Sequence, residues 1–385
     1  MIERLTIWLL RMAAMTAKEL RQLSRDPVLL AVLVYFFTAD VYLAGAGVTM
    51  ELRDASLGVM DHDRSVTSRE LIHRFQAPLF EVEGGVGSGR EARRRLNQGE
   101  LLAVLDIPAD FGRDLLRGQS ASVQMQLDAT NTVLATLAAA DAAEIVGRFA
   151  QEISAKRLGA VGDDSSALPI VLDRHRILYN PNQTDAWFMS ISELLTVITM
   201  LSLMLPAAAA VREKERGTIE QLAVSPLSPF QILFPKVVAM GLAVLLGTAI
   251  CLFFVVVPAF DLPIRGSITL FFTVTALHVF ATSGLGLFIA TLSRNLAQVV
   301  MLVILLMMPL LLLSGSWTPP EAMPQGLRWA MQLSPLFHYI EMGYGILLKG
   351  AGVSVIRTSL LALTLQGLGV FAFGLWRFRR QFDRI

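Results

Sequence analysis

The sequence predicts a mainly α-helical, polytopic membrane protein with six transmembrane helices and an α/β domain inserted between the first and the second. The 385 residues are 54% hydrophobic and 17% charged, and their mean hydropathy is positive. This composition is too apolar for a soluble protein and too charged for a chain that lies wholly in the membrane. Apolar runs of about 20 residues, the length that crosses a bilayer, flank a long polar stretch at residues 49–186 that contains none.

Residues 1–25 are predicted to form an amphipathic helix on the membrane surface. Apolar residues recur there at helical spacing against basic ones such as Lys18, which is the pattern of a helix that binds anionic lipid. Charges run through this segment, so we do not expect a cleavable signal peptide. Residues 26–48 are the first transmembrane segment, with Pro27 in the first helical turn and Asp40 as the one charge in the apolar run.

Residues 49–186 are predicted to fold as an α/β domain with its own core. Charges occur every few residues, and short β-like runs alternate with helical patterns, as is typical of such domains. The expected strands are residues 55–60, 79–82, 101–107, 123–127 and 170–178. The expected helices are residues 65–75, 88–97, 109–116 and 131–158, of which the last is long and rich in alanine.

Residues 187–385 contain the other five predicted spans. These spans are residues 190–211, 237–260, 268–292, 296–313 and 354–376. Residues 212–236 form a charged loop, in which the amphipathic segment 217–224 is able to lie along the membrane surface. Residues 314–352 are of intermediate polarity and rich in proline and tryptophan. They are expected to be re-entrant helices in the outer leaflet, with a plain external loop as the alternative.

Lysine and arginine concentrate on one side of the predicted spans. They gather in residues 1–25, in the loop 212–236 and at the C-terminus. Since basic residues close to a span end resist translocation, both termini and this loop are expected in the cytoplasm. The α/β domain is then expected outside the cytoplasm.

Catalytic, metal and nucleotide chemistry are not expected in this chain. The glycine-rich run 84–91 resembles a phosphate loop but lacks its Lys-Ser/Thr pair. The sequence from His338 to Glu341 does not match the H-E-x-x-H zinc pattern, and the single Cys251 excludes an internal disulfide. The net charge of +1 gives no support for a nucleic-acid partner.

Ionisable residues inside predicted spans are candidates for function because their burial in a membrane is costly. Asp40 and Glu193 lie near the external ends of the first and second spans. They either face an aqueous vestibule or reach the headgroups, and both interpretations stay open. His278, in the fourth span, is interpreted as a hydrogen-bonded packing residue in preference to a proton carrier.

The charged run after the second span is open to two interpretations on charge alone, a docking surface for a partner or an ordinary interfacial cluster. The run from Arg212 to Leu222, Arg-Glu-Lys-Glu-Arg-Gly-Thr-Ile-Glu-Gln-Leu, is followed by Pro226 and Lys236. It resembles the E-x-E-x-G-T-x-E-x-L signature of ABC-2 type transport permeases. The resemblance covers essentially the whole chain and is strongest to the bacterial multidrug-type subfamily with one large external domain.

Further motifs are similar to that subfamily. They are residues 60–65 after the first strand, 178–181 before the second span, and 334–336 with 348–350 before the sixth. One departure is Gly343-Tyr344-Gly345, where relatives usually carry an arginine. No role of that arginine is therefore transferred to this chain.

The resemblance implies that segment 217–224 is a coupling helix in a cleft of a cytoplasmic ATPase subunit, with residues 1–25 as the connecting helix beside it. The candidates for contact with the ATPase are Glu213, Glu215, Gly217, Thr218, Glu220 and Leu222. The resemblance also implies re-entrant helices that shape an external gate, for which Trp317 and Pro320 are candidates beside Asp40 and Glu193. ATP and magnesium would be bound by the partner and not by this chain.

The expected function is therefore that of the membrane subunit of an ATP-driven exporter for drugs, lipids or other amphiphiles in the bacterial inner membrane. A second permease chain, identical or related, and a periplasmic adaptor are the other partners considered. The main alternative is a membrane-anchored sensor or scaffold whose external domain binds a ligand or an assembly partner. A secondary transporter is disfavoured because the spans hold few ionisable residues.

Overall fold

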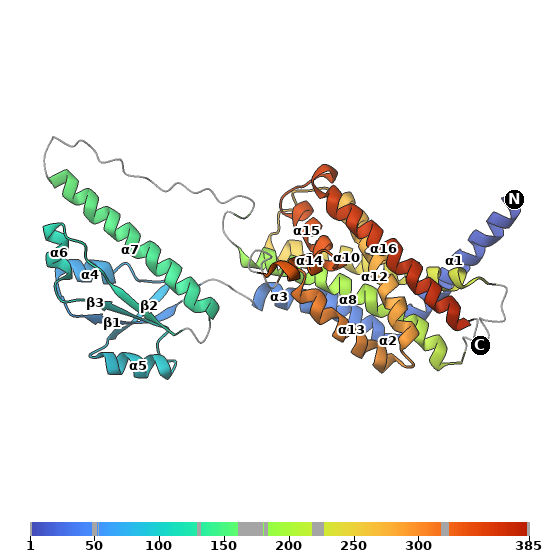
Figure 1. Ribbon diagram of the computed structural model, residues 1–385, viewed down its shortest axis with the longest axis horizontal. Coiled ribbons are helices and arrows are strands. Elements are labelled where there is room, and N and C mark those ends of the chain that lie inside the picture. Colours follow the sequence, from blue (N-terminus) through green and yellow to red (C-terminus); the bar gives the residue numbers. More distant parts are fainter. Residues whose placement is uncertain are drawn as a thin grey trace. The chain divides into compact units, whose positions relative to one another are not determined.

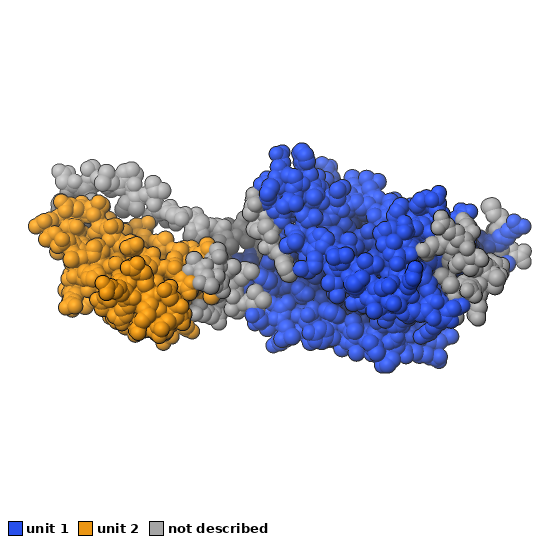
Figure 2. Space-filling view, turned by 60° about the horizontal axis from the view of Figure 1, so that its bottom comes forward, with its two compact units in different colours: residues 1–48, 176–385 blue, residues 49–175 orange. Residues whose placement is uncertain are grey.

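The structure is a computed structural model that divides the chain into two compact units. Unit 1 comprises residues 1–48 and 176–385, and unit 2 comprises residues 49–175 (Figure 2). The described residues are 2–47, 52, 54–128, 132–160, 180, 184–217, 227–316 and 323–382. Each unit is described by itself.

Unit 2 is built on a four-stranded sheet in the order β2-β1-β3-β4. Its strands are β1 (Ala55–Asp61), β2 (Phe80–Gly85), β3 (Ala103–Ile107) and β4 (Gln124–Leu127), and its helices are α4 (Val66–Ile72), α5 (Gly89–Asn97), α6 (Phe111–Arg117) and α7 (Thr132–Ala160). Strand β1 is parallel to both β2 and β3, and β4 is antiparallel to β3. The expected strand 170–178 lies outside the described residues.

Helices cover both faces of this sheet, as Figure 1 shows for α7 and α5. Leu57 and Leu105 share a buried cluster with Phe149 of α7. Met60 and Val104 share a second cluster with Ala92 of α5. Neighbouring residues of a strand point to opposite faces, so the central strands are apolar on both sides and read as nearly continuous hydrophobic runs.

Unit 1 consists of helices, most of which are labelled in Figure 1. They are α1 (Ile2–Ser24), α2 (Pro27–Tyr35), the π-helix η1 (Phe36–Asp40), α3 (Val41–Gly47), α8 (Asp185–Glu215), α10 (Pro229–Ile250), the π-helix η2 (Cys251–Val256), α11 (Val257–Phe260), α12 (Ile268–Leu292), α13 (Leu296–Leu312), α14 (Gln325–Met331), α15 (Pro335–Leu347) and α16 (Val353–Phe382). Helix α8 lies in their middle and contacts α3, α10, α12, α13 and α15.

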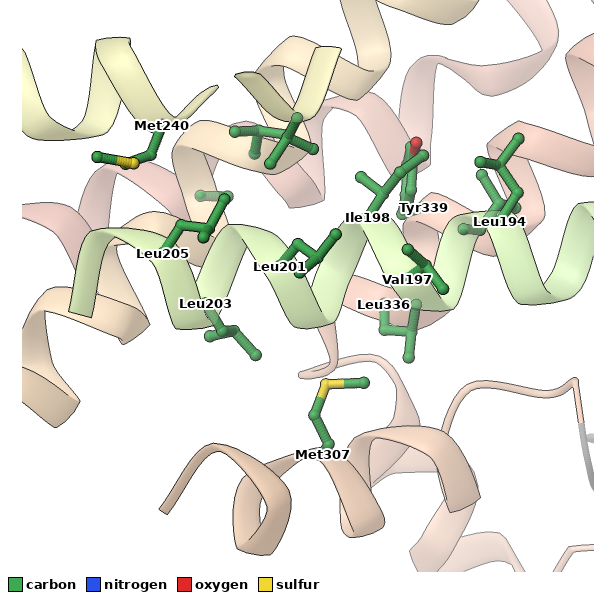
Figure 3. Close-up of a cluster of buried hydrophobic side chains, with 14 of the residues drawn as sticks. Leu194, Val197, Ile198, Leu201, Leu203, Leu205, Met240, Met307, Leu336 and Tyr339 are labelled. Atoms are coloured by element: carbon green, nitrogen blue, oxygen red, sulfur yellow. The ribbon is translucent and has the colours of Figure 1, made fainter. Parts of the chain in front are cut away.

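The contacts of α8 explain why its apolar residues do not fall on one stripe. Leu194, Ile198, Leu201 and Leu203 are fully buried, and Figure 3 shows side chains of α8 that point in several directions. Among the labelled neighbours are Met240 of α10, Met307 of α13, and Leu336 and Tyr339 of α15. A helix that is apolar all round is one that other helices surround.

Among the described residues, five helical runs are long and apolar enough to cross a membrane. They are Pro27–Gly47, Asp185–Glu215, Pro229–Phe260, Ile268–Leu292 and Val353–Arg380. The remaining predicted span, residues 296–313, forms the shorter apolar helix α13 of 17 residues. At 1.5 Å per residue α13 is about 25 Å long, less than the roughly 30 Å of a hydrocarbon core, so its crossing stays a prediction.

The charged loop is shorter than the sequence pattern indicates. Helix α8 continues to Glu215, and α10 begins at Pro229, so the predicted bounds of 212–236 were too wide. The side chain of Ser228 accepts a hydrogen bond from the N–H of Gln231, whose own side chain accepts from the N–H of Ser228. This capping box, with proline at the first helical position, starts α10. The prolines of this stretch had led to its prediction as a loop.

The described part of the segment 314–352 contains two helices, α14 and α15. Residues 317–322 lie outside the described part of the chain, and with them the gate candidates Trp317 and Pro320. Re-entry into the outer leaflet stays a prediction.

Candidate functional site

Four consecutive charged residues form the last turn of α8: Arg212, Glu213, Lys214 and Glu215. Successive residues of a helix point about 100° apart, so the four side chains reach around the helix axis. Their bonded partners are Lys18, Lys236, the carboxylate of Asp26, the carbonyl group of Ala290 and the N–H of Leu296, with Glu19 joined through Lys18 and Lys236. We call these ten residues the charged hub.

Arg212 connects α8 to the start of α2. Its guanidinium forms an ion pair with Asp26, the N-cap residue of α2. The carboxylate of Asp26 also accepts hydrogen bonds from the N–H groups of Val28 and Leu29, at 3.1 and 3.0 Å. The backbone hydrogen bond from Leu29, helped by Arg212, holds the pKa of Asp26 below its ordinary value.

Glu213 connects α8 to α1 and α10 through a buried network. Its carboxylate lies 2.9 Å from the ammonium nitrogen of Lys18 and 2.8 Å from that of Lys236. Lys236 also lies 2.7 Å from the carboxylate of Glu19, and the side chains of Lys236 and Glu19 are each only 1% exposed. Two ammonium groups and two carboxylates thus compensate one another, and of the four only Lys18 is substantially exposed.

The local charges also act on Lys18, which is half-buried. Burial alone would lower the pKa of Lys18, but the hydrogen bond and the charge of Glu213 raise it above its ordinary value. Lys18 is therefore positively charged at neutral pH. The network is complete in that state.

Lys214 and Glu215 connect α8 to the turn between α12 and α13. Lys214 donates a hydrogen bond to the carbonyl of Ala290 in the last turns of α12. Glu215 accepts a hydrogen bond of 2.9 Å from the N–H of Leu296, the first residue of α13. A cation at the end of one helix and an anion at the start of the next are both favourable to the helix dipoles.

The hub thereby joins the end of α8 to five other helices: α1, α2, α10, α12 and α13. Such an arrangement has no reacting group, and it holds helix ends at fixed positions. Among the described residues, no three His, Cys, Asp or Glu side chains lie together as metal ligands. What the hub can do is pass a displacement of one helix end to the others.

The residues predicted to contact an ATPase differ in their exposure. The carboxylate of Glu213 is directed into its own chain, and Glu213 is 7% exposed. Glu215 and Gly217 are exposed, and Gly217 ends the helix with a left-handed φ of 65°. Thr218, Glu220 and Leu222 lie outside the described residues. Contact with an ATPase stays a prediction for all six.

The hub partners on α1 and α10 were not predicted from the sequence. Lys236 is the eighth residue of α10 and not a residue of the preceding loop. A lysine this far inside an apolar helix needs a counter-charge, and this was a usable signal. Glu19, an acid next to Lys18 and Arg21 in a mostly basic amphipathic helix, was the matching signal on the other side.

The structure brings the two intramembrane carboxyl groups together. Asp40, the last residue of η1, and Glu193 of α8 are hydrogen-bond partners, and both are half-buried. Their contact couples the π-helix of the first span to α8.

His278 behaves as the hydrogen-bonded packing residue that was predicted. It is fully buried, and its Nε2 lies 2.8 Å from the hydroxyl of Thr199 on α8. Its ring stacks on that of Tyr339 from α15 with centroids 3.9 Å apart. This contact links α8, α12 and α15 in the interior of unit 1.

Comparison with known proteins places this chain in a family. Residues 27–376 match the family model described as ABC-2 family transporter protein. The inner membrane transport permease YhhJ of Escherichia coli K12 is 34% identical over 363 residues, which cover 94% of this chain and 95% of YhhJ. The probable multidrug ABC transporter permease YbhR of the same organism is 32% identical over 355 residues, 92% of this chain and 94% of YbhR. The ABC transporter G family member 20 of Dictyostelium discoideum is 22% identical over 353 residues, 90% of this chain and 47% of that protein.

Proposed function

Because the chain belongs to the ABC-2 transporter family and is a membrane permease of an ABC transporter, we propose that it exports drugs, lipids or other amphiphiles with energy from a separate ATPase subunit. This ATPase binds ATP and magnesium on the cytoplasmic side. The permease lies in the inner membrane, as the name of YhhJ states for that relative. Both termini face the cytoplasm, and residues 49–186 face the opposite side.

The observation that carries the proposal is the charged hub. The segment 217–224, which follows α8 directly, is the coupling helix that the ATPase displaces on binding ATP. Its displacement reaches the last turn of α8 through Arg216 and Gly217. The hub then distributes it: Glu213 moves α1 and α10, Arg212 moves α2, and Lys214 and Glu215 move the α12–α13 turn.

At the other end of the bundle, the export path opens between two permease chains, identical or related. The Asp40–Glu193 pair, which joins the first span to α8, lies at the vestibule of this path, and the segment 314–352 forms its external gate. ATP binding favours the outward-open state only as far as the ATPase dimer binds that state more tightly. A periplasmic adaptor would act on the external domain.

Co-purification from membranes tests the proposal. An ATPase subunit is expected to accompany the wild-type chain, and Glu220→Lys, which reverses a charge in the coupling segment, is expected to weaken this association at least tenfold. Glu144→Lys, an exposed change on α7 of unit 2, is the matched control and should leave the association unchanged. Absence of any ATPase from the wild-type preparation would favour a membrane-anchored sensor or scaffold.

A further inference from the structure

A long apolar groove lies between α1, α2 and α10, with a volume of about 590 Å³. Its floor is formed by buried side chains, which are Leu23, Leu33 and Phe37. Its two walls are exposed aliphatic side chains such as Val34 of α2 and Leu246 of α10, which are 62% and 63% exposed. Apart from two hydroxyl-bearing residues, the lining residues are apolar.

The floor of the groove is closed by a direct helix contact. A Cβ atom on Gly247 of α10 would lie 2.3 Å from the ring of Phe37. This close approach lets the ring pack on the α10 backbone and holds the groove open above it. The groove is thus a built feature of the helix packing.

One end of the groove lies at the C-terminal end of α1, where two arginines neighbour the lining residue Ser24 in the chain without lining the groove themselves. Ser24, the last residue of α1, lines this end, with Arg21 one turn before it and Arg25 directly after it. Within the described part of the chain, Arg21 and Arg25 have no ion-pair partner. The nearby acids Glu19 and Asp26 are already paired with Lys236 and Arg212, so the polar end carries uncompensated positive charge.

We propose that this groove binds one acyl chain of an anionic phospholipid, whose phosphate lies beside Arg21 and Arg25. From Leu30 to Thr38 the groove runs about 12 Å along α2 and η1, close to the roughly 15 Å of one leaflet's hydrocarbon layer. The apolar lining suits an acyl chain, and the arginines suit an anionic headgroup at the membrane surface. Phosphatidylglycerol has both parts.

The lipid would contact the same helices that the hub joins. Leu23 lines the groove on α1, directly following the turn that holds Glu19, and the lipid would contact α10 between Leu242 and Ile250, beyond Lys236. A bound lipid therefore holds α1 against α10 on the membrane side, as the ion pairs do on the polar side.

Native mass spectrometry of the full chain, extracted from vesicles of phosphatidylcholine and phosphatidylglycerol in equal amounts, tests the binding. The wild type is expected to retain phosphatidylglycerol in preference to phosphatidylcholine. Leu246→Trp fills the groove and is expected to abolish this retention. Leu365→Trp on α16, where the leucine is 70% exposed, is the matched control and should retain the lipid.

The charge part of the proposal has its own variants, at exposed positions that do not endanger folding. Arg21→Gln and Arg25→Gln are each expected to weaken retention about fivefold, and Arg294→Gln, on the α12–α13 turn, is expected to leave it unchanged. Equal retention of phosphatidylcholine and phosphatidylglycerol would overturn the proposal. So would undiminished retention in Leu246→Trp, or a change of oligomeric state in that variant, which would assign the groove to a second chain. The measurement needs neither ATPase nor substrate, so its failure would leave the transport proposal intact.

Discussion

Lys236 shows at the scale of one residue how a charge is kept inside a membrane protein. Its ammonium nitrogen has two carboxylate neighbours, on α1 and on α8, and its side chain is 1% exposed. Desolvation of an ion is costly, and only such partners compensate it. The charge is therefore part of the helix packing.

The first prediction concerns the buried ion pair of Lys236 and Glu19. Lys236→Met is expected to lower the free energy of unfolding by about 3–5 kcal/mol, because it leaves Glu19 buried with a weaker partner. The double variant Lys236→Met/Glu19→Gln is expected to regain most of that loss, since both charges are gone. Unfolding in mixed detergent micelles measures both values.

An exposed ion pair provides the control. Arg74 and Glu152 in unit 2 are 41% and 43% exposed, and Arg74→Ala is expected to cost at most about 1 kcal/mol. A loss in Lys236→Met no larger than this would show that Lys236 is solvated. The hub would then lack its buried centre.

Asp26 gives a prediction of pH dependence. Asp26→Ala removes the N-cap of α2 and is expected to cost about 1 kcal/mol at pH 7. The pKa of Asp26 is lowered in the folded protein, so its charge stabilises fully above the ordinary value of 3.8, and this part is lost as the pH falls further through the folded pKa. The difference in melting temperature between the wild type and the variant should therefore shrink from pH 7 to pH 3, and a constant difference would contradict the role of the charge.

At the scale of elements, α12 lies unusually close to α8. A Cβ atom on Gly286 would lie 2.2 Å from the carbonyl oxygen of Leu203, which is backbone and cannot move aside. Small residues permit such approach between membrane helices. The position of Gly286 thus keeps α12 close enough for Thr199 to reach His278.

The prediction at this scale is that Gly286→Ala destabilises the protein by about 1–3 kcal/mol through overpacking. Gly369→Ala on α16, where a Cβ atom meets nothing within 4 Å, is the control and is expected to be neutral or slightly stabilising. Thermal unfolding measures the melting temperatures of the two variants and so tests this prediction. Equal melting temperatures would mean that α12 and α8 are less tightly packed than described.

Helix boundaries show where sequence patterns suffice and where they do not. Apolar length alone locates α8, α10, α12 and α16, because a span must be long and apolar. It did not reveal that Glu213 and Lys236 lie inside helices, because charge next to a span is usually interfacial. Only the packing of α1 against α10 supplies the counter-charge that makes their burial possible.

For the whole molecule, the family was predictable from the run Arg212 to Leu222, and the comparisons confirm it. The central sheet of unit 2 was also predictable, because its strands alternate with helical patterns. The hub was not, since Lys18, Glu213 and Lys236 are far apart in sequence. Resemblance assigned the charged run to a partner, whereas the structure directs Arg212, Glu213 and Lys214 toward other helices of the same chain.

The orientation of the chain is tested by labelling with an impermeant thiol reagent. In a Cys251→Ser background, a cysteine in place of Ser88 is expected to react from outside the inner membrane, and one in place of Ser225 only after the membrane is opened. Cys251 is the single cysteine of the sequence, so after its replacement the introduced cysteine is the one thiol that can react. The reverse pattern would invert the topology.

The most direct test of the hub is whether ATP binding to the partner changes the external end of the permease. A cysteine in place of Ser316, just after α13, is labelled in reconstituted complexes with and without a non-hydrolysable ATP analogue. We expect the analogue to change the labelling rate at least threefold in the otherwise wild-type complex and not in Glu213→Gln/Lys236→Met, although the ATPase still binds. An undiminished response in that double variant would contradict force transfer through the hub.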